Sequence, residues 1–454
     1  MSPLAPPRIV PPRRPLGRWK FAATFLRNPL EVVPQAAYED DFVPFGGSRA
    51  PRAWITSPAL VKAVLLDQRD KFCKRTQIRL LSPLLGSGIL TSEGAEWRWQ
   101  RQAAAPMFKP ESLASFVPAF VRAAEARLAQ WRAAPAGSAQ PIDVEMTRAT
   151  FDVVAATLLP SADATLPAAI QKSVAMLSEA AGWDLLFASL NLPPWMPHPG
   201  MATSVRAMKT LRSRVATVIA ERRAAGGEPG SDLTRRLIDA RDPETSQAMG
   251  DERLVDNVLT FYLAGHETTA KALTWTLYLL ARSPEWSDAV AAEVARVAGR
   301  EPVTAAHAES LVATQQVLKE AMRLYPPVPI MSRQALVDAE VEGHAVRAGT
   351  SMLIPIYAVH RHEGRWADAH LFRPERFSPE NEPAIPRYQY IPFGAGPRVC
   401  IGRSFAMLEA TVMLATFLRA ASFETDGAEP VPVARVTLLP RDGLRLKVRL
   451  RASV

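Results

Sequence analysis

The stretch Phe393–Gly402, read FGAGPRVCIG, decides the interpretation of this 454-residue chain. It places Cys400 in a loop rich in glycine and proline, and a helix-favouring apolar run, SFAMLEATVMLATFL, follows. Cys400 should therefore lie at or just before a helix N-terminus, where free N–H groups and the helix dipole favour an anionic sulfur. We expect the pKa of this thiol to be depressed and the thiolate to be a good ligand.

The rest of the loop also suits a ligand site. Its glycines let the backbone turn tightly and pass close to a flat object. Phe393 can shield the sulfur, and Arg398 brings a positive charge into the loop. The alternative is that Cys400 is a small buried hydrophobic residue, as most lone cysteines are.

The ten-residue pattern resembles the heme-thiolate loop of the cytochrome P-450 family, in which the cysteine is the proximal iron ligand. The resemblance implies that Cys400 binds heme iron, with Phe393 and Arg398 beside the heme. It also implies that further family motifs occur in a fixed order along the chain.

A long periodic segment, Asp251–Ser283, carries the hexapeptide AGHETT at Ala264–Thr269. A glycine costs about 1 kcal/mol in a helix interior, a hydroxyl there can bend the helix, and the charge of Glu267 needs a reason. These features predict a widened turn beside a cofactor; the alternative is a kinked helix with an exposed glutamate. By resemblance this is the oxygen-binding helix, and Glu267 and Thr268 are the acid–alcohol pair that relays protons.

Trp97 and Arg101 are four residues apart in the helix expected within Glu93–Met107, so they share a face. An indole N–H and a guanidinium group on one face can bind a carboxylate. The resemblance assigns both residues, together with Arg333 and Arg398, to the heme propionates. The alternative is a surface cation–π pair.

Glu320 and Arg323 lie three apart on one helix face, which by itself is an ordinary local ion pair. The sequence PERF follows at Pro374–Phe377. The resemblance implies that Glu320, Arg323 and Arg376 form a buried structural network behind the heme, a role for which arginine's bidentate pairing is suited. It also implies a substrate pocket with the following lining residues: Ala264, Val328, Ile330 and Met331.

Length alone favours two domains, but the ordered motifs overrule that expectation. They imply a mostly α fold with a small β region: the cytochrome P-450 fold, a single triangular domain with a long central helix over the heme. Residues 1–45 form a proline- and arginine-rich segment on the surface, and residues 46–454 form the domain.

Other elements follow from periodicity and from glycine and proline. We expect irregular chain at residues 73–92 and a hairpin turn around Pro440–Gly443. His344, His360 and His362 lack metal-ligand spacing and are interpreted as surface or loop residues. Further helices are expected at Pro110–Pro135, Ile142–Leu159, Pro167–Leu190 and Met201–Ala225.

The net charge is modest, 54 − 45 = +9, and no nucleic-acid-binding module is apparent. The excess is either a scattered surface charge or a basic face for an acidic protein. Cys73 and Cys400 are the two cysteines, so no disulfide framework is expected and a reducing cytoplasm fits. No 18-residue apolar span or secretory signal is present, so we expect no membrane anchor.

The resemblance implies a heme b-dependent monooxygenase that inserts one atom of O2 into an apolar small molecule. No flavin or iron–sulfur domain is apparent, so electrons would come from NAD(P)H through a separate ferredoxin or flavodoxin and its reductase, to a monomeric enzyme. Lys109, Arg398 and Arg403 could steer such an acidic partner. The alternatives are a peroxide-using heme-thiolate enzyme, which would be expected to lack the acid–alcohol pair, and a non-catalytic heme-binding sensor or carrier.

Overall fold

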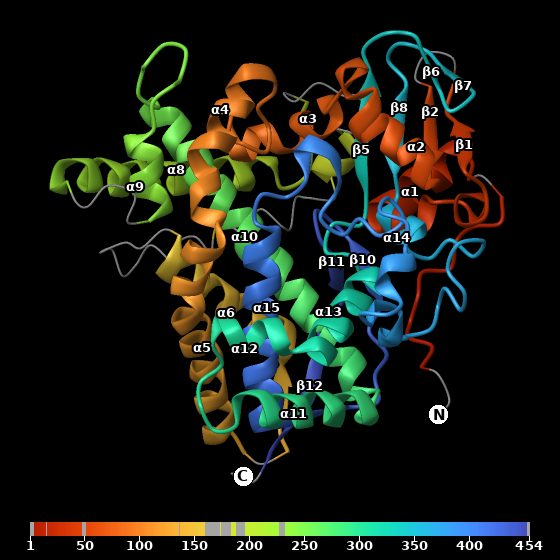
Figure 1. Ribbon diagram of the computed structural model, residues 1–454. Coiled ribbons are helices and arrows are strands. Elements are labelled where there is room, and N and C mark those ends of the chain that lie inside the picture. Colours follow the sequence, from red (N-terminus) through yellow and green to blue (C-terminus); the bar gives the residue numbers. More distant parts are fainter. Residues whose placement is uncertain are drawn as a thin grey trace.

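The computed structural model describes residues 4–14, 16–47, 51–135, 137–158, 173, 183–187, 196–226 and 232–451. Figure 1 shows a mostly helical molecule whose largest sheet lies to one side of the helices. The expected fold class, mostly α with a small β region, is confirmed.

The long helix α10 (Asp251–Ala281) runs through the middle of the molecule (Figure 1) and is buried along most of its 31 residues. It packs along α6 (Ile142–Thr157). A Cβ added to Gly265 would lie only 3.1 Å from Cγ2 of Val154, so the glycine permits close approach of the two helices. The backbone is α-helical throughout α10, so the widened turn expected at AGHETT is wrong. Gly265 therefore allows close packing of α10 on α6 and does not widen a turn of α10.

Most of the expected helices are confirmed, with ends that shift by a few residues. The other α-helices of the described chain are α1 (Arg18–Arg27), α2 (Pro58–Lys62), α3 (Arg75–Leu85), α4 (Gly94–Ala104), α5 (Pro110–Ala133), α8 (Met201–Ala225), α9 (Leu233–Asp239), α11 (Pro284–Ala298), α12 (Ala305–Ser310), α13 (Val312–Leu324), α14 (Ile356–Val359) and α15 (Arg403–Ala420).

The irregular chain expected at residues 73–92 is wrong in part, because α3 occupies residues 75–85. Pro83 lies in the last turn of α3, and the helix ends at Gly86, whose φ of 53° stops the helix. Proline and glycine therefore mark the end of a helix here and not a loop. Of the helix expected at Pro167–Leu190, only residues 173 and 183–187 are described; the rest lies outside the described residues.

The largest sheet has the strand order β1-β2-β8-β5-β3, in which β2 and β8 are parallel and the other pairs antiparallel. A second sheet has the order β4-β12-β9, and β6 and β7 form a separate hairpin. The strands are β1 (Phe42–Phe45), β2 (Arg52–Ile55), β3 (Phe72–Cys73), β4 (Ala139–Pro141), β5 (Met331–Ala335), β6 (Ala339–Val341), β7 (His344–Val346), β8 (Ser351–Ile354), β9 (Ala421–Thr425), β10 (Pro432–Ala434), β11 (Leu438–Pro440) and β12 (Arg445–Leu450).

The C-terminal hairpin is displaced from its expected position. β10 pairs with β11, so the tip is Arg435–Thr437 and not Pro440–Gly443. β12 lies outside this hairpin and pairs with β9 over Leu446–Leu450. β9 offers β12 a longer run of paired residues than a local hairpin would. A turn signal in the sequence could not reveal this distant partner.

The N-terminal segment is tied to the rest of the molecule. Leu4 forms a β-bridge with Phe372, and the carbonyl oxygen of Pro7 accepts a 2.6 Å hydrogen bond from the hydroxyl of Tyr325. Ile9 and Leu30 belong to the main hydrophobic core. The segment 1–45 thus contributes to the core, while its separation from residues 46–454 stays a prediction.

Of the three histidines interpreted as surface or loop residues, His360 and His362 do lie in a loop, but both are buried. His360 accepts a 2.9 Å hydrogen bond from the backbone N–H of Ile391 through Nε2 and stacks on Tyr390. Burial, with Arg323 and Arg361 nearby, lowers the pKa of His360 to about 3, so it stays neutral. His362 is also buried. Among the described residues no cluster of His, Cys, Asp or Glu suited to a metal ion occurs.

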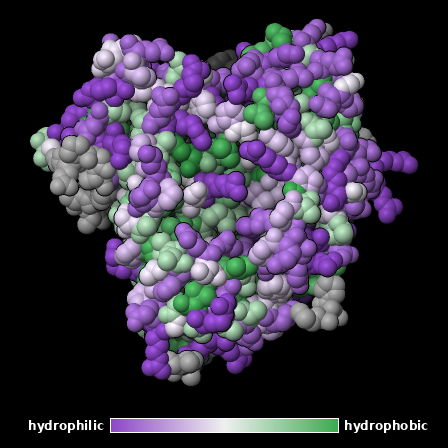
Figure 2. All heavy atoms as spheres, viewed as in Figure 1, coloured by the Kyte–Doolittle hydropathy of each residue, from purple (hydrophilic) through white to green (hydrophobic). Residues whose placement is uncertain are grey.

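Figure 2 shows hydrophilic side chains over most of one face, with hydrophobic ones gathered toward its middle. Within the described chain, no helix combines the length and apolar character needed to cross a membrane.

The loop before Cys400 is fixed by a close backbone contact. Gly396 has a φ of 69°, and a Cβ at this position would lie 2.2 Å from the carbonyl oxygen of Leu65. Backbone hydrogen bonds from Val399 to Gly396 and from Cys400 to Phe393 close the loop.

Gly396→Ala should therefore destabilise the protein more than Gly349→Ala. Gly349 has a φ of 84° but open space around its Cα, so its substitution carries only the backbone strain of about 1–2 kcal/mol. The clash at Gly396 should add a further ~1–3 kcal/mol. Urea unfolding of the two variants measures the difference, and equal midpoints would contradict the tight packing of the loop.

Candidate active site

Cys400 lies between a short 3-10 turn, η8 (Gly396–Arg398), and α15. Its side chain is accessible although the residue lies within the body of the protein, so it borders an internal space. The expectation of a depressed pKa is wrong: burial raises the pKa of the thiol, and this outweighs the N–H of Gly402 and the charges of Arg101 and Arg403. Reasoning from the helix N-terminus omitted the cost of desolvating a thiolate.

Part of α10 borders an internal space as well. Ala264 is exposed within a helix whose neighbouring turns are buried, and Thr268 is partly exposed. Val328, Ile330 and Met331 are also incompletely buried. The methyl carbon of Met331 would lie 3.1 Å from a Cβ at Gly394, so Met331 contacts the cysteine loop directly.

Glu267 and Thr268 each have a defined hydrogen bond. The hydroxyl of Thr268 donates to the carbonyl oxygen of Ala264 at 2.8 Å. The carboxylate of Glu267 accepts a 2.8 Å hydrogen bond from the hydroxyl of Thr437, at the tip of the β10–β11 hairpin. Sequence reasoning missed Thr437 because it placed the hairpin turn several residues too late.

Three of the expected anion-binding residues meet beside the cysteine loop. Arg101 donates through Nη1 to the carbonyl oxygen of Val399 at 3.0 Å. The guanidinium of Arg398 lies 3.8 Å from the centre of the Trp97 ring, and that of Arg101 lies 5.7 Å from it. A cation–π arrangement therefore exists, but it lies at the site and not on a remote surface.

Arg333 and Lys74 extend this positive cluster. Arg333, on β5, donates to Oε1 of Gln77 at 3.2 Å. Lys74 was not expected from the sequence, where it has no distinguishing motif. Burial and then the charges of Arg333 and Arg398 lower the pKa of Lys74 to about 7. Burial likewise lowers the pKa values of Arg333 and Arg398 to about 10, while Glu93 opposes this.

This cluster has more positive charge than its neighbours neutralise. Nη1 of Arg398 is buried and has no hydrogen-bond partner among the described residues. A buried, unpaired cation is costly unless an anion meets it. The cluster therefore fits a ligand with carboxylates, and the neighbouring neutral thiol fits a ligand that brings a metal cation able to deprotonate it.

A buried ion network lies at the base of the cysteine loop. Glu320 and Arg323 are fully buried and form two hydrogen bonds, of 2.7 and 2.8 Å. Nε of Arg376, in the 3-10 turn η6 (Pro374–Phe377), lies 3.5 Å from the Glu320 carboxylate. Arg323 also donates to the following backbone carbonyl oxygens: His360, Ala369 and Leu371. The three expected network residues are therefore in contact.

The family model described as "Cytochrome P450" matches residues 33–448. The chain belongs to the cytochrome P450 family. It is 32% identical over 397 residues to a protein named cyclooctatin synthase from Streptomyces melanosporofaciens, with 87% of this chain and 85% of the relative aligned. It is 30% identical over 427 residues to a cytokinin hydroxylase from Arabidopsis thaliana, with 91% and 81% aligned.

The crystal structure of the cytochrome P450DA heme domain superposes with a TM-score of 0.84 at 26% sequence identity, over 98% of this chain and 99% of that one. Cyclooctat-9-en-7-ol 5-monooxygenase, also from Streptomyces melanosporofaciens, is 32% identical over 86% of this chain and 84% of its own. This P450 is therefore a monooxygenase, of a family that uses heme, dioxygen and reducing equivalents.

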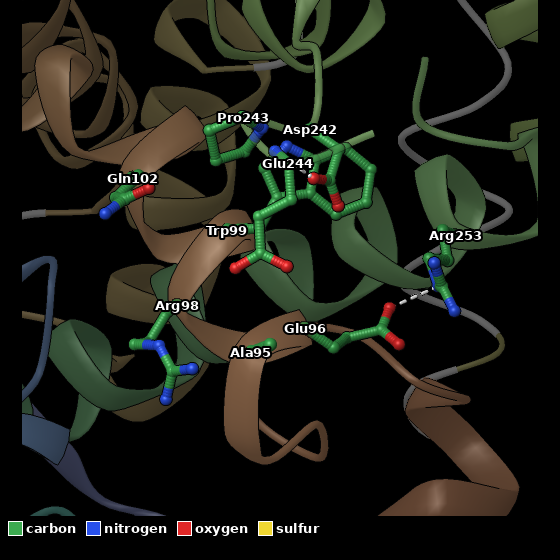
Figure 3. Close-up of a pocket in the computed structure, with 9 residues that line it drawn as sticks. All are labelled: Ala95, Glu96, Arg98, Trp99, Gln102, Asp242, Pro243, Glu244 and Arg253. Carbon is green, nitrogen blue, oxygen red and sulfur yellow. Dashed lines mark hydrogen bonds and ion pairs between the residues drawn. The ribbon is translucent and has the colours of Figure 1, made fainter. Parts of the chain in front are cut away.

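A surface pocket of about 220 Å³ lies on another face of α4. Figure 3 shows charged and polar side chains around it, including Glu96, whose carboxylate pairs with Arg253. None of the P450 motif residues discussed above lines this pocket. We therefore assign it no part in the reaction.

Lys74 predicts how this P450 should hold its heme as pH changes. When no anion is bound, the pKa of Lys74 is about 7, whereas the ordinary pKa of a lysine is near 10.5. Between these two pH values, protonating Lys74 costs free energy. A bound anion removes this cost, so binding should take up a proton in that range and weaken as pH rises, by up to roughly tenfold per pH unit. Heme transfer to excess apomyoglobin at several pH values measures the slope.

Lys74→Met should remove most of this slope, whereas Lys109→Met, at an exposed position, should keep it. If both variants retain the slope of the wild type, Lys74 does not meet the bound anion.

Proposed function

We propose that this P450 inserts one atom of dioxygen into an apolar small molecule, with electrons from NAD(P)H delivered by a separate redox protein. The observation that carries the proposal is the side chain of Cys400, which borders an internal space beside a surplus of buried cations.

Heme b suits these residues. Cys400 would be the iron ligand, with Phe393 adjoining it in the same loop. The propionates would be held by the positive cluster and Trp97, that is, by Trp97, Arg101, Arg333 and Arg398, with Lys74 as a further contact. The heme supplies the oxidising chemistry when bound, and the iron would supply the charge that keeps the buried thiol deprotonated.

The protein's own task in the reaction is to deliver protons without admitting bulk water. In this proposal the hydroxyl of Thr268 passes a proton toward the reacting oxygen, and the carboxyl group of Glu267 resupplies it. The hydrogen bond of Thr268 to Ala264 holds the hydroxyl on the exposed side of α10. Such a pair favours monooxygenation over the peroxide-using alternative, and a sensor or carrier would have no use for it.

The network of Glu320, Arg323 and Arg376 is proposed to act structurally. It connects α13 to η6, and Tyr390, just before the cysteine loop, donates to the backbone of Lys319 at 2.9 Å. The chain that leads into the cysteine loop is thus tied to α13.

An apolar substrate is supported by the residues that would line the pocket: Ala264, Val328, Ile330 and Met331. The relative named cyclooctat-9-en-7-ol 5-monooxygenase acts, by its name, on an alkenol, which agrees with such a lining. A screen of apolar alcohols for a shift in the heme spin state tests the substrate class.

A ferredoxin or flavodoxin with its reductase is the proposed electron source. Lys109 and Arg403 are exposed at the two helices next to the cysteine loop and can attract an acidic partner. We propose that the enzyme is a cytoplasmic monomer.

Cys400→Ser should abolish the thiolate-type absorption of the reduced carbon monoxide complex, because a serine hydroxyl is a far weaker electron donor to iron. Cys73→Ser, at the second cysteine, is the matched control and should leave the spectrum unchanged. An unchanged spectrum in the Cys400 variant would rule out Cys400 as the ligand.

Thr268→Ala should release reducing equivalents as hydrogen peroxide and lower product per NADPH by about tenfold or more. Thr274→Ala is the control, because Thr274 makes the same i−4 hydrogen bond, to Ala270, but is fully buried. Product and peroxide are measured with a compound from the spin-shift screen. Full coupling in the Thr268 variant would remove this hydroxyl from the relay.

A further inference from the structure

Arg361, just after α14, is buried together with its charge. The residue is 1% exposed, and all three nitrogens of its guanidinium group are buried without a hydrogen-bond partner among the described residues. An arginine side chain stays protonated in proteins, so this is a positive charge out of contact with water. Its strongest electrostatic neighbours are Tyr357, Tyr325, Arg323 and Tyr38, and none of these is a carboxylate.

Arg323 shows what a buried guanidinium group ordinarily requires. It too is fully buried, but it pairs with the carboxylate of Glu320 and donates to three backbone carbonyl oxygens. Arg361 has neither kind of partner in the part of the chain that the structure describes. Burying an unpaired charge costs much free energy, so a counter-charge is expected at Arg361.

Aromatic rings meet only part of this need. The guanidinium carbon of Arg361 lies 3.8 Å from the centre of the Tyr357 ring and 5.4 Å from that of Tyr325. The faces of these rings attract the positive charge. They are weak acceptors for N–H groups, however, and they carry no net charge. The N–H groups of Arg361 therefore still lack strong acceptors.

Two tyrosine hydroxyls add further unused donors. The hydroxyl of Tyr38 is buried and has no hydrogen-bond partner among the described residues, and the charge of Arg361 acts on its pKa. The hydroxyl of Tyr357 accepts a 3.2 Å hydrogen bond from the N–H of Ile9, which leaves its own proton to donate. A 3.0 Å hydrogen bond from the N–H of Glu363 to the carbonyl oxygen of Tyr38 connects the two chain segments.

From this surplus of donors around an unpaired charge, we infer that Arg361 binds a small monovalent inorganic anion such as chloride, with the hydroxyls of Tyr38 and Tyr357. One such ion balances one guanidinium charge and accepts several N–H and O–H groups at once. A water molecule would leave the charge unbalanced and would itself need acceptors. A small ion is indicated because the guanidinium nitrogens have no contact with solvent.

The anion would join three separate parts of the chain. Tyr38 ends the 3-10 turn η2 (Gln35–Tyr38), Tyr357 belongs to α14, and Tyr357 in turn holds the N-terminal segment through Ile9. Because these parts meet only in the folded protein, the site exists only there. Binding should therefore stabilise the native state in proportion to the logarithm of the anion concentration.

Urea unfolding of the heme-loaded enzyme in sodium chloride and in sodium gluconate, at one ionic strength, tests the inference. Above the Kd, each tenfold rise in chloride should raise the folding equilibrium constant of the wild type about tenfold. Arg361→Met should lose this dependence, and in gluconate it should unfold no earlier than the wild type, since it no longer buries an unpaired charge. Tyr38→Phe should fold normally and weaken chloride binding about tenfold.

The matched control is Arg387→Met. The guanidinium of Arg387 also lies over a tyrosine ring, 5.9 Å from the centre of Tyr388, but the residue is exposed, so this variant should keep the chloride dependence of the wild type. Crystals grown in sodium bromide should show a bromine anomalous peak in contact with Arg361. A wild type equally stable in both salts, a chloride effect that persists in Arg361→Met, or absence of that peak would overturn the inference.

Discussion

The pairing of Glu320 with Arg323 is the interaction on which the site depends most. Both side chains are fully removed from water, so neither charge is tolerable without the other. Arg323 also donates to three backbone carbonyl oxygens in the chain between α14 and η6. One guanidinium group thereby fixes the path of a segment with little regular structure, and His360 in that segment bonds to Ile391 just before the cysteine loop. The pair on α13 is thus connected, through His360 and Ile391, to the chain just before Cys400.

The motifs found in the sequence predicted the fold class and which residues would meet. Their order along the chain was sufficient, because Trp97, Arg101 and Arg398 do meet, as do Glu320, Arg323 and Arg376. The pKa values and the roles of individual glycines were harder to predict from the sequence. The pKa of the Cys400 thiol depends on desolvation by residues distant in sequence, and Gly265 is explained by a valine on another helix.

Local signals also failed where distant partners compete. The turn chemistry of Pro440–Gly443 was genuine, but β12 gained a longer ladder with β9. Residues 75–85 formed a helix despite Pro83, and the helix ends at Gly86, shortly after the proline. Lys74 and Thr437 had no motif at all; each matters only through neighbours that folding brings to it.

The attachment of the N-terminal segment has a consequence for protein engineering. Leu4 pairs with Phe372, which directly follows Leu371, whose carbonyl oxygen accepts from Arg323. Pro7 and Ile9 are hydrogen-bonded to the hydroxyls of Tyr325 and Tyr357. Purification tags are usually attached to the first residues of a chain, and N-terminal truncations remove them, on the assumption that these residues do not affect the fold. In this protein, a change there acts on the part of the fold that carries Cys400, the proposed heme ligand.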